Sequence, residues 1–168
     1  KPFYLSDEDV KWAEETFSSM TTEEKIGQLF FLIVYGPDAE TIDKIAKEIG
    51  AGGAMCRAMP TENVVATVSA LQKKSKIPML ISANLEAGGN GISDQGTKVG
   101  SQMMIAAAGG AKYARYLGEV CAAEGLAVGA NYSFAPVADI DYNFRNPITN
   151  TRTFGSDPGK VADLASAY

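Results

Sequence analysis

A chain of 168 residues, of which 46% are hydrophobic and 21% charged, is long enough to bury one core and too short for two domains. Its net charge of −5, with lysines scattered among acids, offers no basic face for nucleic acid. No apolar run approaches the roughly 18 residues that a membrane-spanning helix needs, so we expect no membrane partner and leave small neutral ligands open.

Helix and strand signals alternate from the start of the chain. Two capping-box patterns, in which a hydroxyl residue stands three positions before an acid, predict helices that begin after Ser6 and Thr21. The run LFFLIVY (29–35) is continuously apolar, which predicts a strand covered on both faces. An amphipathic helix is then expected over 39–49.

The rest of the chain repeats this alternation. In chain order we expect a strand at 51–57, a helix at 63–74, a strand at 77–84, a polar glycine-rich loop to about 100, a helix at 111–124, a strand at 125–136 and a helix from 158. In the helix at 111–124, we expect Tyr113, Leu117, Val120 and Cys121 to face the core. Alternation of this kind is typical of parallel strands joined by helices, so we predict an α/β fold with about four β/α units.

Two of the predicted loops are unusually long for this architecture, in which such loops commonly have about 2 to 6 residues. The first follows the strand at 77–84 and begins SANLEAGGNG, which places Asn84, Glu86 and several glycines at a strand end. Ligand sites in parallel sheets gather at the carboxyl ends of strands. These glycines lack the spacing of a dinucleotide or phosphate loop, so we interpret them as a tight backbone path beside a small ligand.

Four segments resemble one known family. MTTEEKIGQLF, IPMLISANLEAGG, CAAEGLAVGANYSFAPVADI and RNPITNTRTFGSDP are similar, in this order and spacing, to the amino-terminal barrel of family 3 glycoside hydrolases. The resemblance implies a TIM-type (β/α)8 barrel, of which residues 1–168 form the first half as one incomplete domain. It also implies a saccharide substrate and hydrolysis of terminal β-linked sugars with retention.

The resemblance assigns substrate-binding roles to four residues. Asn84 stands where the family usually has an Asp that binds sugar hydroxyls; its amide still donates and accepts but gives no charge-assisted bond. Arg152 in TRTFG matches an arginine that lies in the family's sugar site, Asp139 in PVADI matches the acid of the family's PVxDV segment, and Glu86 belongs to the strand-end motif of Asn84. The alternative for all four residues is structural: Glu86 and Asp139 as caps of backbone N–H groups or partners of an arginine, Arg152 as a member of an ion pair, and Asn84 in a similar structural role.

The catalytic residues of a retaining glycosidase are expected elsewhere. Such an enzyme needs two carboxyl groups about 5 to 5.5 Å apart, and the resemblance places the nucleophilic Asp, the acid/base and a Lys-His pair beyond Tyr168. The chain contains no His, and a full barrel takes about 250 residues. We therefore expect a fragment without turnover of its own, whose unpaired half-barrel edges favour self-association.

Three functions are weighed from these features. The form NPITNTRTFG favours a β-N-acetylglucosaminidase over a β-glucosidase as the parent enzyme. The amide at Asn84 favours the alternative of a non-catalytic carbohydrate-binding or regulatory module. A free-standing flavodoxin-like domain is the third hypothesis, although it needs a fifth strand that the sequence does not supply.

No cofactor is predicted. Cys56 and Cys121 lie in apolar surroundings without metal-ligand spacing, so we expect buried reduced thiols and no metal site. The start of the chain shows neither an initiator Met nor a signal segment, which suggests a trimmed chain and assigns no compartment.

Overall fold

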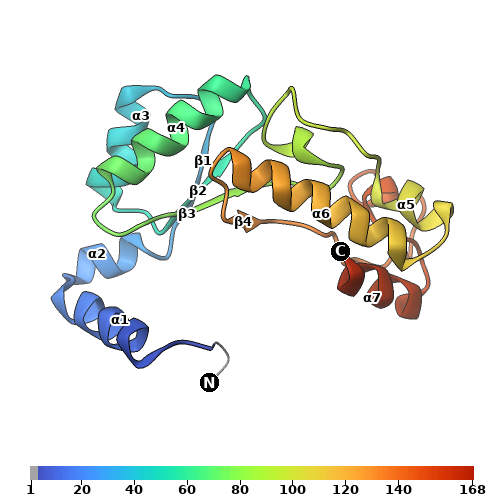
Figure 1. Ribbon diagram of the computed structural model, residues 1–168, viewed down its shortest axis with the longest axis horizontal. Coiled ribbons are helices and arrows are strands. Elements are labelled where there is room, and N and C mark those ends of the chain that lie inside the picture. Colours follow the sequence, from blue (N-terminus) through green and yellow to red (C-terminus); the bar gives the residue numbers. More distant parts are fainter. Residues whose placement is uncertain (1–3) are drawn as a thin grey trace.

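The computed structural model describes residues 4–168, and its strands alternate with helices along the chain (Figure 1). The strands are β1 (Phe31–Val34), β2 (Gly53–Cys56), β3 (Leu80–Ala83) and β4 (Tyr132–Ser133). The helices are α1 (Asp7–Ser19), α2 (Thr22–Gly27), α3 (Ala39–Asp43), α4 (Thr61–Lys74), α5 (Gln102–Ala108), α6 (Ala111–Ala127) and α7 (Pro158–Ala167). The short turns are the π-helical η1 (Lys44–Ile49) and the 3-10 helices η2 (Gly89–Gly91) and η3 (Asn150–Arg152).

The four strands form one open sheet in the order β1-β2-β3-β4, and every neighbouring pair is parallel. Each strand therefore lies beside the strand that precedes it in the sequence, with helical segments in every connection. The register places Phe31 opposite Gly53 and Ser82 opposite Tyr132. The prediction of an α/β fold with four parallel strands is confirmed.

The face of the sheet that the helices cover forms the core. Alternate strand residues point to this face, and Val34, Cys56 and Ile81 are each 0% exposed. Burial of an aliphatic side chain of this size contributes roughly 1.5–3 kcal/mol, so this layer carries much of the stability of the fold. Cys56 and Cys121 are both buried free thiols, as predicted.

The other face of the sheet is open among the described residues. Ile33 on β1 is 49% exposed, Leu80 on β3 46% and Tyr132 on β4 45%. The prediction that the strand at 29–35 is covered on both faces is therefore wrong for this chain. The reason is that only one layer of helices packs on the sheet.

An aromatic cluster lies on the open face. The ring of Phe31 lies over Gly53 of the neighbouring strand, where a Cβ would collide with it. From there it reaches the rings of Tyr132 and Phe134, with centroids 5.9 and 5.4 Å away. The absent side chain at Gly53 thus lets an aromatic residue of one edge strand contact the aromatic residues of the other edge.

The two predicted capping boxes are present. The Ser6 hydroxyl accepts from the backbone N–H of Asp9, whose carboxylate accepts from the Ser6 backbone, and Thr21 and Glu24 repeat this exchange. The helices they start, α1 and α2, stand at one end of the molecule (Figure 1). Helix α1 has no buried residue.

The secondary structure of residues 100–136 differs most from the elements predicted from the sequence. Helix α5 was not predicted, and its N-cap is Ser101. Helix α6 continues to Ala127, which leaves β4 only two residues. The prediction that Tyr113 faces the core is wrong, because it is 40% exposed. Helix α6 instead buries small residues such as Gly118, where a Cβ would collide with the carbonyl of Tyr168, so α7 packs closely on it.

Candidate functional site

A bidentate ion pair lies at the carboxyl end of β3. Glu86, two residues beyond Asn84, accepts hydrogen bonds from Nε and Nη2 of Arg152, each 2.7 Å long. Arg152 ends the 3-10 turn η3, and its Nη1 donates to the carbonyl of Ile148 at 3.4 Å. The fork of a guanidinium matches a carboxylate in this geometry, so the two residues fix each other's orientation.

Asp139 lies close enough to act on this pair electrostatically. The pKa of Arg152 is raised above its usual value, chiefly by the hydrogen bond to Glu86, with smaller contributions from the charges of Glu86 and Asp139. The side chain of Arg152 is 45% exposed and that of Glu86 only 14%. The cation therefore faces solvent, while its partner carboxylate is shielded behind it.

Asn84 is half-buried at the end of β3, and its amide makes no hydrogen bond with any residue in 4–168. Its backbone carbonyl packs against Gly91, where a Cβ would collide with it. Gly88 has a φ of +136°, which an L side chain rarely adopts, and it lies against the carbonyl of Thr97. The glycines thus allow the tight path that the sequence predicts.

A side chain of α6 and one at the end of α7 hold the end of β3 in place. The carbonyl of Leu85, between Asn84 and Glu86, accepts from the Tyr168 hydroxyl at 2.7 Å and from the Cys121 thiol at 2.9 Å. Burial raises the pKa of Tyr168 well above its ordinary value and also raises that of Cys121, so both groups keep the protons they donate. Neither contact was predicted, because no spacing in the sequence signals it.

Side chains from α5 and α6 fix the two long loops. The amide of Gln102, which is 0% exposed, donates to the carbonyl of Val137 and accepts from its N–H, both at 2.8 Å. The Glu124 carboxylate accepts from the backbone N–H of Thr97 at 2.8 Å and from its hydroxyl. The loops that carry Asp139 and the glycine-rich run are therefore anchored to helices.

This arrangement suits the recognition of hydroxyl groups. Arg152 donates three of the roughly five N–H groups of a guanidinium to Glu86 and Ile148, which leaves about two for a ligand. Asn84 adds a donor and an acceptor. Among the four predicted site residues, the structure joins Glu86 to Arg152 and brings Asp139 within electrostatic range, while no hydrogen bond links Asn84 to these three within the described residues.

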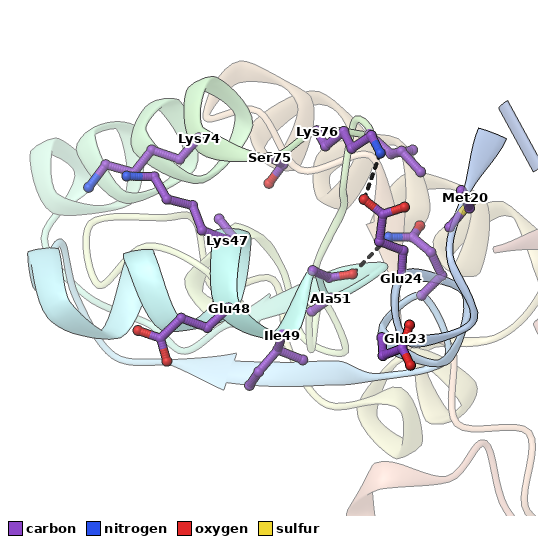
Figure 2. A pocket seen from close by; sticks show the side chains of 14 residues that line it. Met20, Glu23, Glu24, Lys47, Glu48, Ile49, Ala51, Lys74, Ser75 and Lys76 are labelled. Carbon is purple, nitrogen blue, oxygen red and sulfur yellow. Dashed lines mark hydrogen bonds and ion pairs between the residues drawn. The ribbon is translucent and has the colours of Figure 1, made fainter.

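A hollow of about 320 Å³ lies at the opposite end of the sheet and contains none of the four predicted residues. Helix α2, η1 and the connection between α4 and β3 form its walls. Figure 2 shows Lys76 bonded to Glu24, a contact of 2.6 Å. Lys47 and Lys74 both reach Asp43 at 2.9 Å. The lysines that line the hollow are thus paired with neighbouring carboxylates. We therefore assign the hollow a structural role.

Within residues 4–168, no three His, Cys, Asp or Glu side chains are arranged to hold a metal ion. None of the helices in this part of the chain combines the length and the apolar character needed to cross a membrane.

Comparison with known proteins gives one consistent family. The profile of the glycosyl hydrolase family 3 N terminal domain matches residues 21–168. A beta-N-acetylglucosaminidase/beta-glucosidase from Cellulomonas fimi is 44% identical over 167 residues, which cover 99% of this chain and 30% of that protein. Beta-hexosaminidase A of Pseudoalteromonas piscicida is 28% identical over 75% of the chain and 23% of its own length.

Solved structures agree with this comparison. The beta-glucoside phosphorylase BglX bound to 2FGlc superposes with a TM-score of 0.92 at 43% identity, over 100% of this chain and 31% of that one. A family 3 beta-N-acetylglucosaminidase from Paenibacillus sp. superposes with a TM-score of 0.81 at 28% identity, over 89% of this chain and 30% of that one.

The chain thus spans about 30% of the length of the Cellulomonas fimi protein and of the phosphorylase BglX. Its open sheet of four parallel strands corresponds to the N-terminal half of the barrel domain in these structures, which confirms the predicted fold. From the matched profile, the sequence identity and the superposed strands, we conclude that the chain belongs to glycoside hydrolase family 3 and falls within its N-terminal domain.

Proposed function

We propose that this chain supplies the sugar-binding half of a retaining glycosidase that cleaves terminal β-linked sugars, with a β-N-acetylglucosaminide preferred over a β-glucoside. Asn84, Glu86, Asp139 and Arg152 form the substrate-binding site in this proposal. Glu86 orients Arg152, and Arg152 and Asn84 contact sugar hydroxyls directly.

The observation that carries the proposal is the bidentate pair between Glu86 and Arg152 at the carboxyl end of β3, with N–O distances of 2.7 Å. A guanidinium fixed on one side and exposed on the other is preorganised to donate to hydroxyl oxygens. The preference for the acetylated sugar is supported by two relatives, a beta-N-acetylglucosaminidase from Paenibacillus sp. and a protein from Cellulomonas fimi that is named both beta-N-acetylglucosaminidase and beta-glucosidase.

Binding of N-acetylglucosamine and of glucose to the chain, followed by NMR titration, tests this proposal. We expect Arg152→Ala to weaken binding of both sugars at least tenfold. Arg115→Ala removes an exposed arginine of α6 and serves as the matched control, with no change expected. Equal binding by the Arg152→Ala variant and the unaltered chain would show that the site lies elsewhere.

The nucleophile and the acid/base are not assigned to residues of this chain. The proposal therefore includes the absence of turnover by the 168-residue polypeptide alone. Release of nitrophenol from an aryl β-glycoside by that polypeptide would contradict it. In the whole protein, sugar binding without hydrolysis would favour the alternative of a non-catalytic carbohydrate-binding module.

The open face of the sheet also supports self-association of the isolated chain. Ile33, Leu80 and Tyr132 are 45–49% exposed there, and within the described residues β1 and β4 each have only one strand neighbour. Sedimentation velocity is expected to show a concentration-dependent dimer or larger species. A folded monomer at all concentrations would refute this part of the proposal.

Phosphorolysis is a second candidate for the whole protein. Its support is that two solved structures, each 43% identical to this chain, are named as a beta-glucoside phosphorylase. A phosphorylase transfers the sugar to inorganic phosphate, whereas a hydrolase transfers it to water. Assay of the whole protein with and without phosphate separates the two, because only phosphorolysis produces a sugar 1-phosphate.

A further inference from the structure

The backbone carbonyl of Leu85 accepts two hydrogen bonds from side chains that lie far away in the sequence. The Tyr168 hydroxyl, directly after α7, donates to it at 2.7 Å, and the Cys121 thiol of α6 donates to it at 2.9 Å. A carbonyl oxygen has two lone pairs, so both of its acceptor positions are filled. Because Leu85 is 3% exposed, these two donors take the place of water at this oxygen.

The two hydrogen bonds fix the direction of a side chain in the candidate site. The carbonyl of Leu85 belongs to the planar peptide unit that ends at the Cα of Glu86. Donors on this oxygen therefore set the rotation of the unit, and with it the direction in which the Glu86 side chain leaves the backbone. Since Glu86 accepts the two 2.7 Å hydrogen bonds of Arg152, a change in this direction would also move the guanidinium.

One face of α6 brings the two donors together. Gly118 lies three positions before Cys121, and a Cβ on it would collide with the carbonyl of Tyr168. Gly125 lies four positions after Cys121, and a Cβ on it would lie 3.0 Å from Cδ1 of Leu85. Residues three and four positions apart share a face of a helix. The face of α6 that carries the thiol therefore contacts Tyr168 at one end and Leu85 at the other.

Attachment of α7 to the core does not require these donors. Val161 and Leu164 of α7 are 3% and 2% exposed, and they belong to the hydrophobic core. Their contacts need no hydroxyl or thiol directed at a carbonyl. The two donors converge instead on the one peptide carbonyl between Asn84 and Glu86, two of the four predicted site residues. This convergence favours a role in the site over a role in helix packing alone.

From this geometry we propose that Tyr168 and Cys121 are positioning residues of the sugar site, which hold the peptide between Leu85 and Glu86 so that Glu86 directs Arg152 towards the sugar. This inference rests on the proposed function, because it takes Arg152 as a contact of the sugar. Tyr168 and Cys121 act through the backbone in this scheme. They do not touch the sugar, and they take no part in bond cleavage.

Two NMR measurements on the chain test this role. The first is the binding of N-acetylglucosamine, and the second is the solvent exchange of the Arg152 Nε–H, which the hydrogen bond to Glu86 protects. Tyr168→Phe removes only a hydroxyl, and we expect it to weaken sugar binding about 3- to 10-fold, the usual effect of one hydrogen bond, and to speed the exchange. Cys121→Ala is expected to act in the same direction but less, because a thiol is a weak donor. Cys121→Ser keeps a donor and is expected to restore binding to within about twofold of the unaltered chain.

Control variants separate positioning from stability. Tyr116→Phe removes a hydroxyl from a tyrosine of α6 that is 61% exposed, so neither measurement is expected to change. Val161→Ala removes buried methyl groups from α7 but keeps both donors to Leu85. We expect it to lower stability and to leave sugar binding within about twofold. Circular dichroism checks that each variant is folded during the titration. If Tyr168→Phe does not fold, the comparison of Cys121→Ala with Cys121→Ser decides.

Each outcome bears on one of the two proposals. Unchanged sugar binding in Tyr168→Phe and Cys121→Ala overturns the positioning role and leaves the sugar site in place. Weaker binding with unchanged Arg152 exchange also overturns that role, because the effect would not pass through the pair of Glu86 and Arg152. An equal loss of binding in Val161→Ala would show that stability alone is responsible, with the same consequence.

Failure of the proposed function is recognised separately. If the unaltered chain binds no sugar, the proposed function is wrong, and the exchange of the Arg152 Nε–H alone decides the positioning role. Faster exchange in Tyr168→Phe then supports positioning of the ion pair by Tyr168, and unchanged exchange overturns it.

Discussion

The pair of Glu86 and Arg152 gives a quantitative prediction for stability. We consider Glu86→Ala, Arg152→Ala and the double substitution. Fully exposed ion pairs contribute about 0–1 kcal/mol, and breaking a fully buried pair costs about 3–5 kcal/mol. This pair lies between these limits, because the side chains are 14% and 45% exposed and two hydrogen bonds of 2.7 Å join them. We expect a coupling free energy of about 1–2 kcal/mol.

The two single substitutions are expected to differ in cost. Arg152→Ala leaves the shielded carboxylate of Glu86 without its two donors, whereas Glu86→Ala leaves a guanidinium that water can still solvate. We therefore expect a loss of about 2 kcal/mol for Arg152→Ala and about 1 kcal/mol for Glu86→Ala in the free energy of unfolding.

Urea denaturation of the four proteins at pH 7, followed by circular dichroism, measures these values. Lys11→Ala is the control, because the Lys11–Glu15 pair spans 3.8 Å with side chains 74% and 68% exposed, and its loss is expected to cost less than about 0.5 kcal/mol. A coupling below about 0.3 kcal/mol, or a larger loss for Glu86→Ala than for Arg152→Ala, would refute the reasoning from burial.

Three further predictions concern the scaffold. Gln102→Leu is expected to cost about 2–4 kcal/mol in the free energy of unfolding and to speed hydrogen exchange of the 134–149 loop, because both polar backbone groups of Val137 lose their partner. Gly118→Ala is expected to lower the melting temperature, since the new Cβ would collide with the Tyr168 carbonyl. Burial raises the pKa of Cys56 from 9.0 to about 11, so the folded state retains a proton that the unfolded state loses. Stability is therefore expected to fall by about 2–3 kcal/mol between about pH 9 and 11, measured by urea titration, and Cys56→Ala to flatten that slope.

The controls for these predictions come from the same chain. Gln95→Leu changes an exposed glutamine, and Gly36→Ala adds a Cβ with no atom within 4 Å, so each is expected to leave stability within about 0.5 kcal/mol. Burial also raises the pKa values of Cys121 and Tyr168, so part of the alkaline slope is expected to persist without Cys56. Unchanged hydrogen exchange in the Gln102→Leu variant, an unchanged melting temperature for Gly118→Ala, or an identical alkaline slope without Cys56 would contradict the respective prediction.

Features determined by neighbours in the sequence were predictable. The capping boxes at Ser6 and Thr21 depend on residues three positions apart, and both helices start where the pattern indicates. The order of strands and helices follows from hydrophobic patterns of a few residues, and it matches the structure. Helix α5 was missed: its seven residues lie between the predicted loop, which ends at about 100, and the predicted helix from 111, and no element was assigned to this stretch.

Features determined by tertiary contacts were not predictable in the same way. The helical pattern of 111–124 is compatible with Tyr113 on the buried face, but the close approach of α7 at Gly118 rotates the smaller side chains inward. Similarly, the apolar run at 29–35 carries no information about which layer covers each face, and in this chain Ile33 is 49% exposed.

The candidate site combines both kinds of feature. Glu86 and Arg152 were each predicted as ligand contacts, with an ion pair as the alternative, and the structure pairs them across 66 positions in the sequence. The Leu85 carbonyl between Asn84 and Glu86 is held by Tyr168 and Cys121, which lie 83 and 36 positions away. This support acts on the backbone, and the Asn84 amide makes no hydrogen bond within the described residues. The side chain of Asn84 therefore takes no part in holding the strand end in place. In the proposed sugar site, the consequence of this amide falls on the ligand, which meets a neutral donor and acceptor in place of a charge-assisted hydrogen bond.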